Sequence, residues 1–188
     1  MSVQQCTDCF FITGINSVQI HTKMDATGKK DLVKLQFGEY VALGKVEAEL
    51  KTYPLIENIC VFGSGLHTYL IALIIPNQMH LKTIAKDLGK GDLSFGEMCS
   101  DEEITAEAAE RVRDFGKNGE KGVGCLLKGG LFGSELPKKI KLCTEEWNPE
   151  SGLVTAAFKI RRKHIENRYK SVIDSMYSES MQNGPSSM

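Results

Sequence analysis

The alternation of apolar and polar positions becomes clear from about residue 29 onward. Two short runs, Asp31–Gln36 and Glu39–Leu43, flank the dipeptide Phe37-Gly38 and predict a β-hairpin. Glycine suits this turn because it adopts backbone angles that other residues resist. The domain is therefore expected to open with a two-stranded hairpin.

The next segment predicts a short helix and two strands. An apolar stripe over about Lys45–Lys51 predicts a helix that Pro54 ends. Asn58–Gly63 and His67–Ile75 read as strands. The longest apolar run, Tyr69–Ile75, is far shorter than the roughly 20 residues of a membrane helix and is rich in β-branched residues. It therefore predicts a buried strand, and no transmembrane segment is expected.

Helix signals follow this strand. Asn77 is placed as an N-cap and Gly89 as a stop, with an apolar face between them. After a connector at 91–99, Ser100 and Glu103 predict a capping box for a helix that reaches Phe115.

The last part of the pattern predicts one strand and one long helix. Leu136–Thr144 alternates lysines with apolar residues, as in a half-buried strand. Ile160–Tyr177 has an apolar stripe at helical spacing and a basic beginning. The expected fold is α+β, a small antiparallel or mixed sheet with an N-terminal hairpin, covered by three to four helices.

Three segments lack either period. Residues 1–28 are expected to be an unrelated or disordered extension, and 178–188 a disordered tail. Residues 116–134 are glycine-rich but fit neither the G-x-x-x-x-G-K-[ST] nor the G-x-G-x-x-G pattern. They are expected to form a flexible insertion rather than a phosphate-binding loop.

Composition narrows the function classes only slightly. The net charge of −1 over 188 residues gives no general attraction to nucleic acid, so no nucleic-acid partner is expected. The basic start of the last helix leaves a nucleic-acid or membrane-surface patch as a weaker alternative. Six scattered cysteines indicate free thiols in a reducing compartment. The single C-x-x-C at Cys6 and Cys9 is a weak zinc signal, and no metal site is expected.

One lysine stands out by its position. Asn148, Pro149 and Gly152 predict a chain reversal, and Lys159 ends the following loop just before the basic helix. Such a placement lets a charge reach a neighbouring cleft while its backbone is held. By this argument alone, Lys159 is more simply one of many surface lysines. No other nucleophile, acid or base forms a closed catalytic set.

Two stretches of the sequence resemble segments of a known domain family. KDLVKLQFGEYVALGKVEAEL, beginning at Lys30, and WNPESGLVTAAFKIRRK, beginning at Trp147, resemble the opening segment and last motif of one domain family. The family that they resemble is the C-terminal domain of long-chain acyl-CoA synthetases (long-chain fatty acid–CoA ligases) in the adenylate-forming, AMP-binding superfamily. The resemblance covers about 29–115 and 135–177, so a domain is expected at 29–177.

The resemblance implies a two-step reaction, in which a fatty acid carboxylate attacks ATP to form an acyl-adenylate and coenzyme A then displaces AMP. Lys159 matches the lysine that serves the first step. Lys30 and Asp31 match the hinge about which this mobile lid domain turns between two poses. Gly38, with Glu39 and Tyr40, matches the hairpin beside the coenzyme A channel.

The resemblance also implies partners. ATP with Mg²⁺ and coenzyme A are co-substrates bound mainly by a large N-terminal domain that this sequence lacks, so the chain is expected to need that domain, in cis or in trans. Gly28 stands where the family usually has an arginine, and the glycine-rich stretch reads as an insertion into a connection that is ordinarily short. Together these two departures fit a truncated or alternatively spliced product. The alternative is a non-catalytic module that docks on the full enzyme. The expected location is the cytosolic side, since full-length family members typically lie on endoplasmic reticulum or mitochondrial outer membranes.

Overall fold

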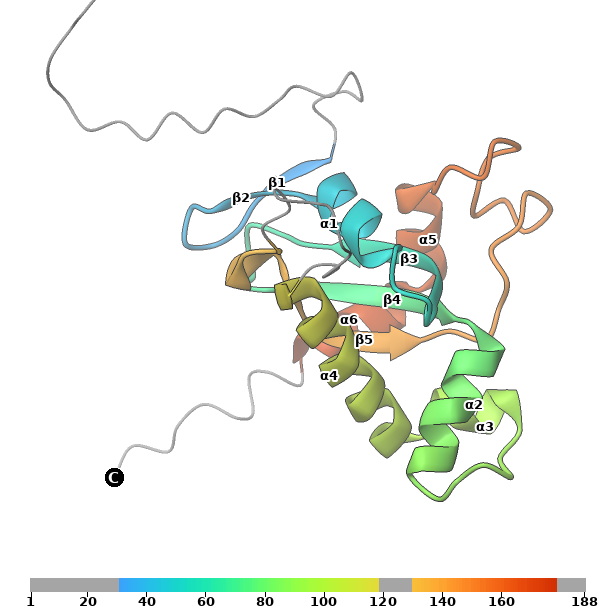
Figure 1. Ribbon diagram of the computed structural model, residues 1–188. Helices are drawn as coiled ribbons and strands as arrows, with labels where there is room; N and C mark the ends of the chain where they lie inside the picture. The colour runs from blue at the N-terminus through green and yellow to red at the C-terminus, as the bar shows by residue number, and fades with distance from the viewer. Residues whose placement is uncertain (1–30, 119–129, 179–188) are drawn as a thin grey trace, which may run out of the picture.

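The computed structural model describes residues 31–118 and 130–178, and Figure 1 shows their arrangement. Strands β1 (Leu32–Lys34) and β2 (Tyr40–Ala42) form an antiparallel hairpin. A separate three-stranded sheet has the order β3-β4-β5. Its strands are β3 (Ile56–Phe62), β4 (Leu70–Pro76) and β5 (Pro137–Leu142), with β3–β4 antiparallel and β4–β5 parallel.

Six α-helices and one short 3₁₀ helix lie around these sheets within the described residues. They are α1 (Leu43–Leu50), α2 (Gln78–Asp87), α3 (Phe95–Ser100), α4 (Glu102–Asn118), η1 (Gly133–Glu135), α5 (Arg162–Arg168) and α6 (Lys170–Ser178). This arrangement confirms the predicted α+β class with a hairpin and a small mixed sheet. None of the helices in the described ranges is both long and apolar enough to cross a membrane.

The three-stranded sheet separates two hydrophobic clusters because every residue of β4 is buried. Side chains of α1, α2, α3 and α4 pack with one face, for example Val46, Leu81 and Ile104. Side chains of α5 and α6 pack with the other face, for example Ile165 and Ile173. The four helices between the hairpin and β5 therefore stabilise one side, and the C-terminal pair stabilises the other (Figure 1).

The cap signals of the middle region are mostly confirmed. The side chain of Asn77 accepts from the backbone N–H groups of the first turn of α2, and Gly89 has φ of +73°. The predicted connector at 91–99, however, contains most of α3, whose own capping box joins Ser94 and Glu97.

The predicted capping box at Ser100 and Glu103 is wrong. Ser100 is the last residue of α3, and its hydroxyl donates to the carbonyl of Gly96 at 2.9 Å. Asp101 instead caps α4, since its carboxylate accepts from the N–H groups of Glu103 and Ile104, each at 3.0 Å. A second short helix upstream changed which polar residue occupies the cap.

The predicted single helix over 160–177 is two helices, α5 and α6, separated at Tyr169. The ring of Tyr169 lies 6.4 Å from that of Trp147, and its hydroxyl donates to Glu145 at 3.0 Å. Both helices carry the same apolar stripe, so the period alone could not reveal the break.

The glycine-rich segment is structured at both of its described ends. Residues 116–118 form the end of α4, and Leu131 is buried. A Cβ on Gly130 would lie 2.7 Å from the carbonyl oxygen of Gly116, so glycine permits a close backbone approach there. The predicted flexible insertion therefore does not extend over these ends. Residues 1–30, 119–129 and 179–188 lie outside the described residues, and the proposed domain limits stay a prediction.

Candidate functional site

The loop that carries Lys159 is attached to the C-terminal hydrophobic cluster. Leu153 and Val154 are buried, and Val154 forms an antiparallel bridge with Ile160. The N–H of Arg161 donates to the carbonyl of Leu153 at 2.9 Å. The sequence folds this way because two apolar residues anchor one arm of the turn and Ile160 begins the other.

Hydrogen bonds inside the turn hold the backbone of Lys159. The N–H of Thr155 donates to the carbonyl of Lys159 at 2.9 Å, and the N–H of Lys159 donates to the hydroxyl of Thr155 at 3.2 Å. The side chain of Lys159 is exposed. The turn therefore combines a held backbone with an ammonium that faces solvent.

The residue before Lys159 has a strained backbone. Phe158 has φ of +54°, and it is the one non-glycine residue with positive φ in the described ranges. The left-handed region costs a non-glycine residue about 1–2 kcal/mol. Phe158 is also 66% exposed. Strain and an exposed aromatic ring next to Lys159 both point to a functional constraint on this turn.

Arg162, three residues after Lys159, is tied to the opposite part of the domain. Its guanidinium forms a two-pronged ion pair with Glu47 of α1, at 2.5 and 3.0 Å, and donates to the carbonyl of Val61 in β3. Glu47 also accepts from the N–H of Val61 at 2.7 Å. The pair thus joins the start of α5 to α1 and to the outer edge of β3.

Electrostatics in this cluster favour the charged pair. Burial alone would lower the pKa of Arg162, but hydrogen bonding to Glu47 and the nearby negative groups outweigh it, so the pKa is raised above its ordinary value. Burial also raises the pKa of the neighbouring Cys60 thiol, despite the opposing charge of Arg162. Cys60 is therefore a buried neutral thiol beside a permanent cation.

The predicted hinge lies beside the same cluster. The carboxylate of Asp31 is 3.6 Å from Nε of Arg162, and its carbonyl accepts from the N–H of Leu43 at 2.9 Å. The other predicted hinge residue, Lys30, lies outside the described residues. Arg162 therefore links one predicted hinge residue to the segment that carries Lys159.

The predicted channel hairpin has the expected turn. Gly38 has φ of +89°, and its N–H donates to the carbonyl of Leu35 at 2.9 Å. Glu39 is exposed, Tyr40 is 64% exposed, and the adjacent Phe37 is 81% exposed. In Figure 1 this hairpin lies at the left, whereas the long connection after β5 extends to the right. The structure thus keeps the hairpin and the Lys159 loop on different sides.

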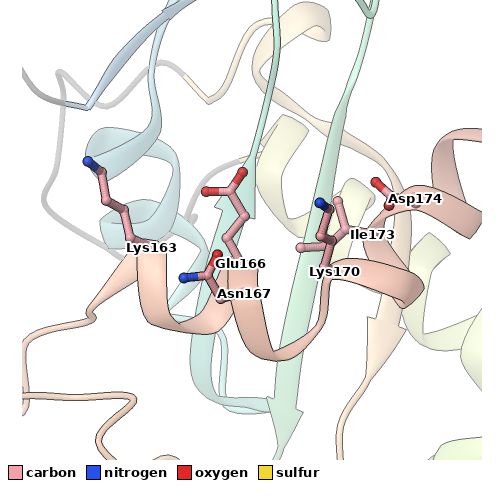
Figure 2. A pocket seen from close by; sticks show the side chains of 6 residues that line it. All are labelled: Lys163, Glu166, Asn167, Lys170, Ile173 and Asp174. Atoms are coloured by element: carbon pink, nitrogen blue, oxygen red, sulfur yellow. The ribbon is translucent and has the colours of Figure 1, made fainter.

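A hollow of about 270 Å³ runs beside α5 and α6. Figure 2 shows that its side chains come from these two helices: Lys163, Glu166, Asn167, Lys170, Ile173 and Asp174. Two lysines and two carboxylates leave it without a net charge, and Lys159 does not line it. The described residues also contain no group of three His, Cys, Asp or Glu side chains that could hold a metal.

Sequence reasoning missed Glu47 and Arg162 as site residues. Both lie within the two quoted stretches, but nothing in the spacing of 115 residues between them indicates a contact. A buried arginine requires a partner, so the only available signal was an arginine beside the apolar stripe of its helix.

Comparisons with known proteins identify relatives of this chain. The chain is 40% identical over 150 residues to long chain acyl-CoA synthetase 8 of Arabidopsis thaliana. The aligned region covers 80% of this chain and 19% of that protein. It is 33% identical over 153 residues to long-chain-fatty-acid–CoA ligase 1 of Schizosaccharomyces pombe, covering 80% of this chain and 21% of the relative. The chain thus spans about a fifth of the length of these relatives.

A solved structure supports the same assignment. The A-PCP didomain of carboxylic acid reductase from Segniliparus rugosus, in complex with AMP, superposes with a TM-score of 0.63 and 26% identity. The match covers 82% of this chain and 18% of that chain. No family model matches the sequence. Together the relatives and the fold show that this chain belongs to the long-chain acyl-CoA synthetases of the AMP-binding superfamily and corresponds to their C-terminal domain.

Proposed function

We propose that this domain supplies Lys159 to the adenylation step of a long-chain fatty acid–CoA ligase, and that it acts only together with an N-terminal domain. The observation that carries the proposal is an exposed lysine on a hydrogen-bonded turn, within a domain homologous to these ligases. The alternative of an ordinary surface lysine does not account for the strained backbone of Phe158 beside it.

The chemistry needs a positive charge at this step. A fatty acid carboxylate and a phosphate, both anionic, must approach one another, and the five-coordinate phosphorus carries added negative charge. An ammonium placed between their oxygens stabilises the transition state more than the separated reactants. Because hydrogen bonds to Thr155 hold the backbone of Lys159, little ordering of the loop remains to be done when the domain closes.

The described residues of this domain could contribute only part of the binding sites for the co-substrates. They offer one exposed ammonium and an exposed hairpin, and they lack a cluster of metal ligands. We therefore assign the binding of ATP with Mg²⁺, and most of the binding of coenzyme A, to the N-terminal domain. The fatty acid substrate is assigned to that domain as well.

The two sides of this domain suit two successive poses. The Lys159 loop would face the N-terminal domain during adenylation, and the Gly38 hairpin would face it during thioester formation. Asp31 directly precedes β1, where a few backbone rotations could reorient the whole domain. A glycine at position 38 keeps the hairpin backbone free to approach the thiol channel, with Glu39 and Tyr40 at its rim.

The decisive experiment is fatty-acid-dependent ATP–pyrophosphate exchange by a full-length synthetase that carries this domain. Lys159→Ala is expected to lower exchange by roughly 10²–10³, or about 3–4 kcal/mol of transition-state stabilisation. Thioester formation from supplied acyl-adenylate should change little. Lys163→Ala is the matched control, because Lys163 is also exposed and lies on the same segment. Normal exchange with impaired thioester formation would show that Lys159 serves the other step.

A second candidate is a non-catalytic module that docks on the intact synthetase. It is favoured by the exposed side chains of Phe37 and Tyr40 in the hairpin and of Leu66 in the loop between β3 and β4. A pull-down with the N-terminal domain at physiological salt, followed by an exchange assay, separates the two candidates. Binding that restores exchange supports the ligase role, whereas binding without exchange supports the module.

We also propose that the domain works in a reducing compartment, on the cytosolic side of endoplasmic reticulum or mitochondrial outer membranes. Three cysteines of the described residues, Cys60, Cys99 and Cys143, are free and buried. A disulfide-forming compartment would not favour three unpaired thiols in one small domain. Fractionation of cells that express the tagged chain tests this location.

A further inference from the structure

Strand β5 forms one edge of the three-stranded sheet. The N–H of Cys143 donates to Ile74 of β4, so by the alternation of a parallel ladder the backbone of Ile140 faces the other way. Within the described ranges, no protein group bonds to the outward N–H or C=O of Ile140. An unpaired strand edge is a template for another extended chain.

A groove of about 710 Å³ runs along this edge, between α4 and α6. Its α4 wall has small side chains at its centre, Thr105, Ala106 and Ala109, between Glu102 and Arg113. The α6 wall is formed by Val172, Ser175 and Met176. The small residues of the α4 wall leave room beside the strand.

The groove carries a net positive charge. Its lining includes Arg113, Lys138, Lys139 and Lys141, against the single carboxylate of Glu102. Arg113 donates to the carbonyl of Lys138 at 3.1 Å, and Lys139 donates to the carbonyl of Met176 at 2.8 Å. Among the described residues, Lys138 and Lys141 have no carboxylate within ion-pair distance. A ligand with carboxylates spaced along a strand would complement this lining.

We propose that the β5 edge binds an acidic peptide segment in extended conformation, which adds to the sheet beside β5. The backbone of Ile140 would hydrogen-bond the peptide, and its acidic side chains would lie near Lys138 and Lys141. Lysines on an edge strand can also act simply to prevent aggregation. That role explains the charges but not the small side chains at the centre of the α4 wall. The proposal is independent of the ligase role, since Lys159 does not line the groove.

The test uses the 188-residue chain and a fluorescein-labelled peptide of alternating Glu and Val, with a Lys–Val peptide of equal length as control. The Glu–Val peptide is expected to bind at least about tenfold more tightly, because opposite charges attract across the groove. Amide hydrogen exchange should slow at Ile140 when it binds. Lys138→Glu with Lys141→Glu should weaken binding about tenfold or more, while Lys82→Glu with Lys86→Glu on α2 should leave it unchanged.

A second variant guards against misfolding. Ala106→Glu lies at an exposed position of α4, where glutamate is a good helix former, and it should weaken peptide binding similarly. Equal binding of both peptides, or no slowing at Ile140, would overturn the proposal. Equal affinity for a single-stranded oligonucleotide or for phosphatidylserine vesicles would instead assign the groove to polyanions. Concentration-dependent slowing at Ile140 without peptide would show that a second copy of the chain occupies it, and would also overturn the proposal.

Discussion

The two edge strands of the three-stranded sheet, β3 and β5, differ in what contacts their outward backbone groups. At the β3 edge, both backbone groups of Val61 are occupied, its N–H by Glu47 and its carbonyl by Arg162. At the β5 edge, the corresponding groups of Ile140 face a basic groove between two helices. One edge is closed by an internal ion pair, whereas the other borders a groove.

The difference separates two uses of charge in one small domain. The Arg162 and Glu47 side chains are 21% and 12% exposed, so their charges are largely removed from water and depend on each other. Lys138 is exposed, with its ammonium 5.3 Å from the centre of the Tyr69 ring, and Lys141 is half-buried. Neither lysine has a carboxylate within ion-pair distance among the described residues. Buried charge in this domain ties Arg162, three residues after Lys159, to α1 and β3, whereas the exposed charge is the part that we propose recognises a ligand.

The largest effect is expected from opening the closed edge. Glu47→Ala leaves Arg162 buried without its carboxylate and frees the N–H of Val61, so the free energy of unfolding should fall by about 3–5 kcal/mol. Urea denaturation followed by circular dichroism measures this change. The exposed pair of Arg168 and Glu145 provides the comparison, because Arg168→Ala should cost less than about 1 kcal/mol. Equal losses in the two variants would remove the distinction between the pairs.

Replacing both Glu47 and Arg162 by apolar residues separates the stability of the pair from its positioning role. Glu47→Leu combined with Arg162→Met should recover most of the lost stability, since apolar residues of similar volume often replace a buried pair without loss. In a full-length synthetase the double variant should still slow ATP–pyrophosphate exchange, because the start of α5 is no longer tied to α1 and to Asp31, the predicted hinge residue. Full stability with full exchange would argue that the pair has no positioning role.

Alkaline pH tests the thiol beyond the β5 end. Burial raises the pKa of the Cys143 thiol to about 12, from an ordinary value of 9.0. Below about pH 9 the Cys143 thiol is protonated in both the folded and the unfolded chain, so the free energy of unfolding keeps its full value. As the pH rises toward 12 only the unfolded chain ionises, and the free energy of unfolding falls. At pH 10 the loss is about 1.4 kcal/mol for this group. Cys143→Ala should reduce the difference in unfolding free energy between pH 8 and pH 10 by about that amount.

The smallest effect is expected at the open edge itself. Lys141→Glu should change the free energy of unfolding by less than about 0.5 kcal/mol, because the side chain forms no ion pair with the described residues. The same substitution should still weaken binding of the acidic peptide. A large loss of stability in thermal denaturation would mean that the lysine belongs to the internal packing.

Local signals were enough to predict several elements. Asn77 and Gly89 mark the ends of α2 because capping depends on residues adjacent in sequence. The turn at Gly38 and the buried strand β4 were predicted for the same reason, since turn chemistry and apolar runs are local properties. The exposed position of Lys159 at the end of a loop also followed from neighbouring turn residues.

Other features depended on contacts between distant segments. The break at Tyr169 goes with packing against Trp147 and a hydrogen bond to Glu145, neither of which alters the apolar period of the helix. The pairing of Glu47 with Arg162, and the groove beside β5, exist only because the sheet brings α1, α4, α5 and α6 around it. Amino-acid order specifies local elements through short-range sterics and hydrogen bonding. Which charges become buried, and which strand edge stays open, is decided when those elements pack.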